Sequence, residues 1–330
     1  MLFPRLDRVR YLGLFHEKQA CFEHKPWVES QLSAFGVRVL PWRYCADHET
    51  DLIREWAAAQ PLVLRTNRTD GGAGVRLVRN PSDLDAEWPS HGDGFLAAAP
   101  LLVPSVPLNV NGCLFSDGTV TLHGPSLQLI GIEGLTNRCF GYCGNDFARA
   151  TDLGCEVLHD LETITVTAGH WLHGQGYRGA FGVDALLYDG RVHLTEVNPR
   201  FQGSSRMSAH IDRTLDRADV FLEHIAAFLD LPPSPQIPLP ELAAAQPPLA
   251  HVIAHNVRET PISSAPIVQD EPSLECRLLP SPDVAVQPEG IAFEAVFSRS
   301  VTVDGMALLP GTREELHTLS LRLFPGATSG

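Results

Sequence analysis

Residues 179–205 read GAFGVDALLYDGRVHLTEVNPRFQGSS and carry the strongest structural signal in the chain. Apolar runs at 181–187 and 192–197 flank Tyr188-Asp189-Gly190, a pattern that predicts two strands joined by a tight turn. Because side chains alternate between the two faces of a strand, Glu196 and Asn198 share one face.

The length of the turn decides whether Asp184 joins that face. A two-residue turn would pair position 183 with position 196 and place Asp184 on the opposite face. A three-residue loop with a left-handed Gly190 and a following bulge would pair position 182 with position 196. Asp184 and Glu196 would then be diagonal neighbours, about 7 Å apart at the backbone. We expect the three-residue loop.

The chemistry of this trio indicates a magnesium site. Two carboxylates and one amide oxygen are hard donors, which suit Mg2+ better than zinc. Magnesium usually completes its coordination shell with water and phosphate oxygens, so Asp184, Glu196 and Asn198 together imply a bound nucleotide or similar polyphosphate. The alternative is that both acids are solvated strand residues and Asn198-Pro199 is a simple turn.

A glycine-rich hairpin supports the nucleotide interpretation. Apolar residues at 62–64 and 75–78 flank a turn that contains Gly71, Gly72, Ala73 and Gly74, and Arg65 lies on the strand that leads into it. Backbone N–H groups in such a turn can approach phosphates closely. The turn lacks the Gly-Lys-Ser/Thr of a Walker A motif and lies between two strands, unlike a dinucleotide fingerprint. The alternative is a merely flexible turn.

In order and spacing, these segments resemble the ATP-grasp superfamily over residues 24–230. His24-Lys25 with the helical pattern that follows resembles its opening element, the glycine hairpin its phosphate loop, residues 95–103 its hinge and residues 179–200 its closing element. The resemblance implies an α+β fold in which two α+β lobes clamp ATP.

The resemblance also implies residue roles and a reaction. Asp184, Glu196 and Asn198 would bind Mg2+, and Arg200, with Arg178 beside the element, would serve catalysis. The remaining contacts to ATP would come from Lys25, Arg65, Gly71, Gly72, Ala73, Gly74, Ala98, Ala99 and Leu101. The implied chemistry is phosphoryl transfer to a carboxylate followed by attack of an amine. Amino acids or their derivatives are the expected substrates, and the reaction forms an amide or peptide bond between them.

Three features depart from the family pattern. Arg65 stands where a lysine is usual, which keeps the charge and changes the shape. The hinge, Leu96-Ala97-Ala98-Ala99-Pro100, lacks an acid for the ribose hydroxyls. Only 23 residues precede the region of resemblance, so the C-terminal domain or a partner subunit in a homodimer is expected to complete the substrate wall.

Composition and charge limit the partners. The chain has 330 residues, of which 44% are hydrophobic and 19% charged, and its formal net charge is -14. These values indicate a globular protein and argue against nucleic acid and anionic membranes as partners. No apolar run approaches the roughly 20 residues of a bilayer span, and the first 15 residues lack signal-peptide features, so we expect a cytoplasmic protein.

Changes in composition predict four segments. They are a short N-terminal segment (1–23), an ATP-grasp domain (24–231), a linker with seven prolines (232–248) and a small, mostly β C-terminal domain (249–330). Within the first domain, residues 123–147 form a polar loop in which Arg138 could clasp a substrate carboxylate and Asp146 an ammonium group. The alternative for both residues is a structural role in the loop.

Three functional classes follow from the sequence. The first is an ATP-dependent carboxylate–amine ligase. The second keeps the fold but performs kinase or carboxylase chemistry, and the third is a catalytically degenerate module that binds nucleotide without turnover. Retention of Asp184, Glu196 and Asn198 together favours an enzyme.

Overall fold

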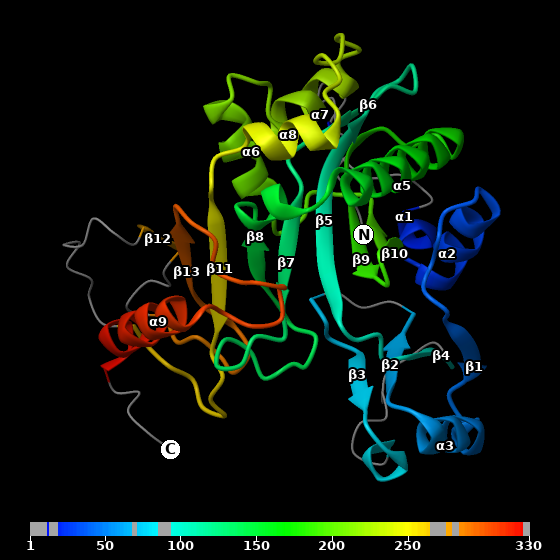
Figure 1. Cartoon of the computed structure of the whole chain (residues 1–330), viewed down its shortest axis with the longest axis vertical. Helices are drawn as coiled ribbons and strands as arrows, with labels where there is room; N and C mark the ends of the chain where they lie inside the picture. The colour runs from blue at the N-terminus through cyan, green and yellow to red at the C-terminus, as the bar shows by residue number, and fades with distance from the viewer. Residues whose placement is uncertain are drawn as a thin grey trace, which may run out of the picture.

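The structure, a computed structural model, describes residues 12, 19–67, 71–84, 94–264, 275–278 and 284–325. It divides into a small lobe built on a four-stranded sheet and a larger body built on a nine-stranded sheet (Figure 1). Within the described residues, the paired strands of both sheets are antiparallel, as expected for the α+β architecture.

The small lobe carries the predicted glycine hairpin. Its strand order is β1-β4-β2-β3, where the strands are β1 (Arg43–Ala46), β2 (Leu62–Thr66), β3 (Val75–Val78) and β4 (Phe95–Pro100). Helix α3 (Thr50–Ala59) covers one face, followed further along by the short 3-10 helix η1 (Pro81–Asp83). Buried Ile53, Leu62, Leu64 and Leu96 pack between this helix and the sheet, so the lobe has its own hydrophobic core.

The large sheet runs in the order β10-β9-β5-β7-β8-β11-β13-β12, with β6 paired to β5. Its strands are β5 (Ser105–Leu114), β6 (Val120–Leu122), β7 (Ser126–Ile130), β8 (Tyr142–Asp146), β9 (Gly179–Tyr188), β10 (Arg191–Asn198), β11 (Ala250–His255), β12 (Glu275–Leu278) and β13 (Ile291–Phe297). Residues 123–147, which were expected to form a polar loop, instead supply two strands in the middle of the sheet.

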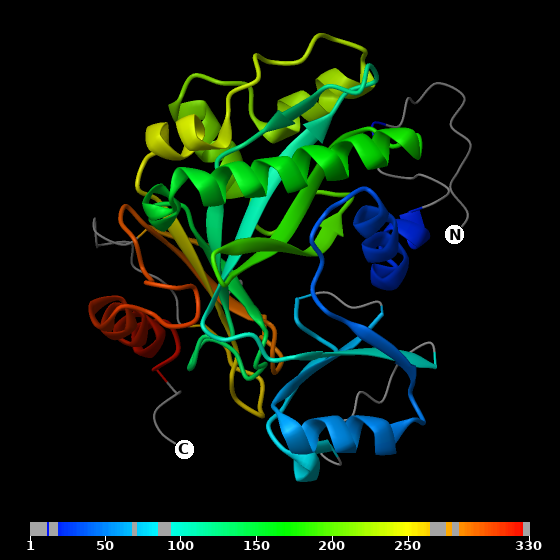
Figure 2. The ribbon, with the colours of Figure 1, turned by 45° about the vertical axis from the view of Figure 1, so that its right-hand side comes forward.

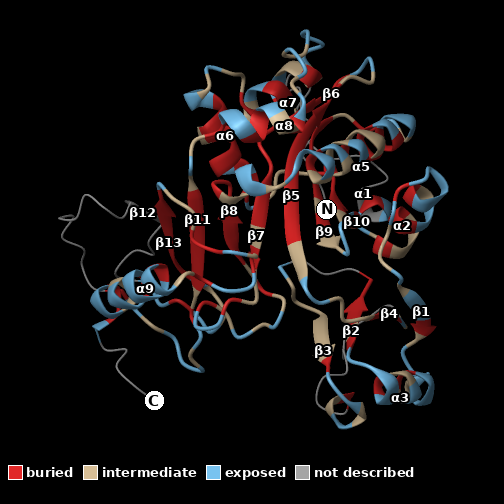
Figure 3. Cartoon of the chain, in the orientation of Figure 1, coloured by how far each residue is buried: buried red, intermediate tan, exposed pale blue. Residues whose placement is uncertain are grey.

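Helices cover the large sheet. The long helix α5 (Cys155–Gly174) crosses it, and buried Leu161, Ala168 and Leu172 belong to the same core cluster as the strand residues (Figure 2). The other helices and turns are α1 (Gln19–Phe22), α2 (Lys25–Ala34), η2 (Arg149–Asp152), α6 (Ser205–Thr214), α7 (Val220–Phe228), α8 (Leu239–Ala245) and α9 (Pro310–Leu323). Burial is concentrated on the strands, while the helices expose their outer faces (Figure 3).

The C-terminal strands continue the large sheet. β11 pairs with β8 on one side and with β13 on the other, so the sheet runs without a break from β10 to the C-terminal strands. The proline-rich segment 232–248 contains helix α8, whose Leu239, Leu242 and Ala243 are buried in the main core. The division into 24–231, 232–248 and 249–330 stays a prediction.

The chain passes from the small lobe to the large sheet directly after β4. Residues 101–104 follow β4 and lead directly into β5, and the peptide bond between Val103 and Pro104 is cis. Among the described residues, no helix has both the length and the apolar character to cross a membrane.

Candidate active site

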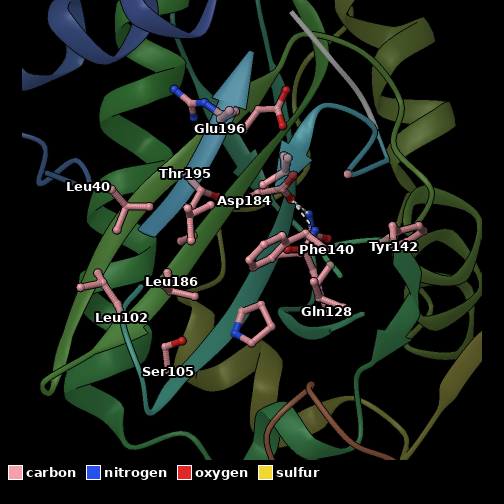
Figure 4. Close-up of a pocket in the computed structure, with 18 of the residues that line it drawn as sticks. Leu40, Leu102, Ser105, Gln128, Phe140, Tyr142, Asp184, Leu186, Thr195 and Glu196 are labelled. Carbon is pink, nitrogen blue, oxygen red and sulfur yellow. Dashed lines mark hydrogen bonds between the residues drawn. The ribbon is translucent and has the colours of Figure 1, made fainter. Parts of the chain in front are cut away.

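A cavity of about 370 Å3 lies between the two lobes and is the centre of the candidate site. Its walls come from β2, β4 and the glycine turn in the small lobe, and from β5, β7, β8, β9 and β10 in the large sheet. Figure 4 shows Asp184 and Glu196 close together, with Gln128, Phe140 and Tyr142 on one side and Leu102 and Leu186 on the other. Segments far apart in the sequence therefore meet at one place.

The turn between β9 and β10 corrects the three-residue loop that the sequence predicted. Tyr188 pairs directly with Arg191, and both turn residues are left-handed, with φ of 48° at Asp189 and 69° at Gly190. Two positive φ values define a type I′ turn, whose twist suits the flanking strands. By itself, this turn would have placed Asp184 on the opposite face from Glu196.

A β-bulge in β10 brings Asp184 and Glu196 onto the same face of the sheet. Leu194 pairs with Ala185, but Glu196 pairs with Asp184, so Thr195 is the extra residue and the register shifts by one. Directly opposed residues project from the same face with Cβ atoms roughly 5 Å apart. Asp184 and Glu196 are therefore direct partners rather than diagonal ones, and Asn198, opposite Gly182, extends the same face.

Asp184 has an unusual electrostatic environment. Burial and the nearby Glu196 carboxylate raise the pKa of Asp184 to about 7. Three amides donate to its carboxylate: Asn109 at 2.7 Å, Gln128 at 3.0 Å and Asn198 at 3.0 Å. A cation between the two acids would relieve their mutual repulsion, so a site of this kind favours a bound cation.

The donor set fits magnesium. Asp184, Glu196 and Asn198 provide hard oxygen donors on one face at the cavity, which is the ligand type that Mg2+ prefers. No cluster of three or more His, Cys, Asp and Glu side chains suited to a metal occurs within the part of the chain that the structure describes. The site thus has too few protein ligands for a closed metal cage, and the remaining positions suit phosphate and water.

Lys25 reaches this acid pair from the opening helix. Its Nζ lies 2.5 Å from Oε1 of Glu196, and the residue is buried at the first turn of α2. The helical pattern after His24 predicted this helix, and Pro26 at the second position suits a helix start. The expected proximity of Lys25 to the site is therefore present, with Glu196 as its partner.

Arg65 is held by residues that the sequence did not single out. Its Nη2 lies 2.8 Å from Oε1 of Glu29, and both side chains are almost fully buried. The guanidinium group also stacks over the Trp42 ring, 4.2 Å from the ring centroid, and Tyr44 donates to the other oxygen of Glu29. The ammonium group of a lysine is not planar and could not stack flat on the Trp42 ring, which gives a physical reason for arginine at this position.

The glycine turn lies against the large lobe. Gly71 and Gly72 line the cavity, whereas Ala73 and Gly74 do not. Gly72 is left-handed with φ of 77°, and a Cβ atom there would lie 2.0 Å from the carbonyl oxygen of Phe140. Only glycine allows this close approach, because any side chain would overlap the Phe140 backbone.

The hinge contributes part of the expected surface. Ala99 and Leu101 line the cavity, together with Pro100, Leu102 and Val103. Ala98 does not, because its side chain points into the core of the small lobe, where it is 1% exposed. Alternation along β4 places Ala98 on the core face, and the expected nucleotide contact at this residue is corrected.

Arg178 lies outside the cavity, in contrast to Arg200, which lines it. Arg178 donates to Asp230 at 3.0 Å and stacks over Phe228, 5.0 Å from the ring centroid. These contacts are on the far end of β9, so a direct catalytic role for Arg178 is corrected to a structural one.

The two residues expected to read an amino acid do not line the cavity. Asp146 is fully buried and accepts hydrogen bonds from backbone N–H groups of Arg149, Val301 and Thr302, which fix the loop before α9. Arg138 pairs with Glu289, with 2.5 Å between Nε and Oε2. Asp146 is therefore corrected to a structural residue, and Arg138 lies at the edge of the site, against Gly71.

Several lining residues escaped the sequence analysis. Besides Asn198, four side-chain amides face the cavity: Asn109, Gln128, Asn145 and Gln202. They lie on β5, β7, β8 and the turn before α6, and no motif links them in sequence. The only signal is that polar residues alternate with apolar ones in strands that are otherwise buried, as in residues 108–111, Leu-Asn-Val-Asn.

Solved structures share this fold at low sequence identity. Biotin carboxylase from Campylobacter jejuni, in a β-γ-ATP complex, is 16% identical with a TM-score of 0.64, covering 92% of this chain and 67% of that one. The biotin carboxylase domain of 2-oxoglutarate carboxylase from Hydrogenobacter thermophilus, in a complex that contains MgADP and bicarbonate, is 13% identical with a TM-score of 0.60, covering 84% and 62%. N5-carboxyaminoimidazole ribonucleotide synthetase from Thermotoga maritima is 15% identical with a TM-score of 0.56, covering 92% and 71%.

The chain spans about two thirds of the length of these structures. No curated protein matches the sequence. The model of the ATP-grasp domain, however, matches residues 37–204, about half of the chain. This match includes the glycine hairpin, the hinge and the Asp184–Glu196 pair, and it confirms the resemblance seen in the sequence. The chain belongs to the ATP-grasp family.

Proposed function

We propose that this protein is an ATP-dependent carboxylate–amine ligase, which forms an amide bond through an acyl phosphate and releases ADP and phosphate. One observation carries the proposal: Asp184 and Glu196 are opposed on one face at the meeting point of the two lobes. Asn198 and Arg200, which follow along the chain, also line the cavity. A site that had lost its chemistry would have no need to keep this set.

The cavity offers separate surfaces for the parts of ATP. Apolar Val63, Leu101 and Leu186 suit the base, and the glycine turn with Lys25 suits the phosphates. Magnesium, held by Asp184, Glu196 and Asn198, would neutralise charge on the phosphates. Arg200 would bind the oxygen atoms of the transferred phosphoryl group and hold it in line with the acceptor carboxylate.

The reaction consists of two balanced steps. A carboxylate oxygen of the substrate attacks the γ-phosphorus of ATP, an O–P bond forms, the bond to ADP breaks, and ADP leaves. The amine nitrogen then attacks the acyl carbon, a C–N bond forms, the bond to phosphate breaks, and the nitrogen loses one proton. Little covalent help is needed from the protein, so orientation and charge stabilisation carry the catalysis.

A second candidate uses bicarbonate as the carboxylate. The shared fold with biotin carboxylase and N5-carboxyaminoimidazole ribonucleotide synthetase supports this alternative. The same two steps would then give a carboxylated nitrogen in place of an ordinary amide. A cytoplasmic location and a homodimer stay predictions from the sequence.

An ADP-release assay tests the proposal. The protein is incubated with Mg-ATP and pooled amino acids and small carboxylates, in CO2-depleted buffer with and without added bicarbonate, beside the Glu196→Ala variant. Release that depends on the pool and is lost in the variant supports the ligase, whereas release that requires bicarbonate supports carboxylation. Binding of Mg-ADP without release under any condition would favour a nucleotide-binding module, and phosphorylated product without an amide would favour a kinase.

A further inference from the structure

We propose that the wall formed by β7 and β8 is an acceptor subsite for an uncharged polar group, such as a carboxamide or a hydroxyl. We further propose that His251, on the C-terminal strand β11, positions this subsite. The inference rests on the proposed ligase function and adds the chemical class of the acceptor.

Charged and neutral groups occupy different parts of the cavity. Among its described lining residues, the cations are Lys25, Arg65 and Arg200. Lys25 pairs with Glu196, and Arg65 pairs with Glu29, so both are engaged on the nucleotide and metal side. On the opposite wall, formed by β7 and β8, none of the described lining residues is a cation that could partner the carboxylate of a free amino acid.

The opposite wall is built from groups that both donate and accept hydrogen bonds. Gln128 lies on β7, Tyr142 and Asn145 lie on β8, and all three line the cavity. Gln128 donates to Asp184, which places this wall directly beside the acid pair (Figure 4). Carboxamides and phenols match an uncharged polar group, because a buried carboxylate would need a cation beside it.

Tyr142 has a fixed position and stays neutral. Its hydroxyl donates to Oδ1 of Asn145. Its ring packs on Gly203, where a Cβ atom would lie only 2.6 Å from a ring carbon. Burial, with smaller effects from Asp184 and Glu294, raises the pKa of Tyr142 well above its ordinary value of 10.

His251 holds this wall from behind. The ring is only 2% exposed, its Nε2 lies 3.2 Å from Oδ1 of Asn145, and its Nδ1 lies 3.2 Å from Oε1 of Glu294 on β13. Asn145 is fixed at its other end, since its Nδ2 donates to Ser126 at 2.9 Å. His251 and Asn145 are also backbone partners between β11 and β8.

A chain of side chains thus runs from the C-terminal strands to the cavity. Arg206 on α6 pairs with Glu294 and completes it at the far end. Removal of the His251 ring would take away one of the contacts that hold Oδ1 of Asn145, and this would loosen the position of Tyr142, which shares that oxygen. The C-terminal strands β11 and β13, through His251 and Glu294, therefore hold Asn145 in place at the cavity.

The acceptor class is tested with matched pairs of probes. ADP release is measured with Mg-ATP and pooled small carboxylates, using glycinamide, alaninamide and serinamide against glycine, alanine and serine. We expect the amides to give a KM at least tenfold lower, about the effect of one hydrogen bond or unpaired charge. A preference for the free amino acids would overturn the subsite and leave the ligase intact. No release from either set, with Mg-ADP binding retained, would remove both proposals.

Variants test the positioning role with the best of these amides. We expect His251→Leu and Tyr142→Phe to raise the KM for the amide about tenfold, with the KM for ATP changed less than twofold. His251→Gln should recover part of the loss, because its carboxamide can still reach Asn145. The matched control is His255→Gln on the same strand, since His255 contacts the backbone oxygen of Leu135 and does not line the cavity. A lower melting temperature in His251→Leu with both KM values unchanged would reduce His251 to a structural residue and refute the assignment.

Discussion

Substitution of Gly72 by alanine is expected to weaken nucleotide binding while the protein remains folded. An alanine Cβ would lie 2.0 Å from the carbonyl oxygen of Phe140 and 2.5 Å from its carbonyl carbon. An ordinary contact needs at least 3.4 Å, and backbone atoms cannot rotate away, so the glycine turn must withdraw by more than 1 Å. Withdrawal would carry its N–H groups away from the phosphates.

The size of the effect follows from the hydrogen bonds that would be lost. A hydrogen bond to a charged group contributes roughly 1.5–3 kcal/mol, so losing one weakens Mg-ADP binding by a factor of about 10 to 100. The strained left-handed backbone costs an alanine a further 1–2 kcal/mol, roughly, whatever its surroundings.

Gly36→Ala separates these two causes. Gly36 has a φ of 84°, close to the 77° of Gly72, but a Cβ atom there would meet nothing within 4 Å. We expect Gly36→Ala to lose stability with unchanged Mg-ADP affinity in isothermal titration calorimetry, and Gly72→Ala to lose affinity. Equal affinities in the two variants would refute the idea that the turn must lie against Phe140 to bind phosphate.

Four further outcomes are expected. Glu196→Gln should lower substrate-dependent ADP release by at least a hundredfold in a coupled assay, because it removes one of the two carboxylates proposed to hold Mg2+. Arg178→Ala should change the same rate less than twofold, since its ion pair lies on the surface and contributes less than about 1 kcal/mol; a large loss would return it to the active site. Asp146→Asn should destabilise the protein by roughly 2–4 kcal/mol in urea unfolding and leave the KM values unchanged, because it disrupts hydrogen bonds to buried backbone N–H groups. Burial by itself lowers the pKa of His123, but Asp212 and Glu223 raise it to about 9, so the contribution of His123 to stability should be fully present below the ordinary value of 6.5 and should be lost as the pH rises through 9. Urea unfolding across this range should show the slope in the wild type and lose it in His123→Gln.

The strand and helix signals in the sequence were sufficient for much of the fold. The helical pattern after His24 corresponds to α2, and the apolar run at 75–78 after the glycine turn corresponds to β3. Both have a clear local period and a clear end, with Gly36 after the helix and the glycine turn before the strand. Such signals are local, so they can be recognised without knowing which other elements the segment packs against.

Residues 123–147 show where local signals fail. β7 alternates Leu127 and Leu129 with polar residues but spans only five residues, and β8 carries buried Asn145 and Asp146, so it lacks the apolar alternation of an ordinary strand. Their polar side chains are satisfied by each other and by His251, more than a hundred residues away. Pairing over such distances leaves no trace in a window of ten or fifteen residues.

The pair Asp184 and Glu196 shows most directly which features the sequence determines and which depend on the tertiary structure. The sequence by itself determined that Asp184, Glu196 and Asn198 lie on a hairpin, that their donor chemistry suits Mg2+, and that the chain resembles the ATP-grasp family. It could not determine the register, because a turn of two or three residues and a bulge at any later position are all compatible with the same letters. Only the tertiary structure decided that a two-residue turn and a bulge at Thr195 together place Glu196 opposite Asp184. The physical reason is that side chains alternate along a strand, so one unpaired residue, fixed by packing across the whole sheet, decides which face an acid occupies.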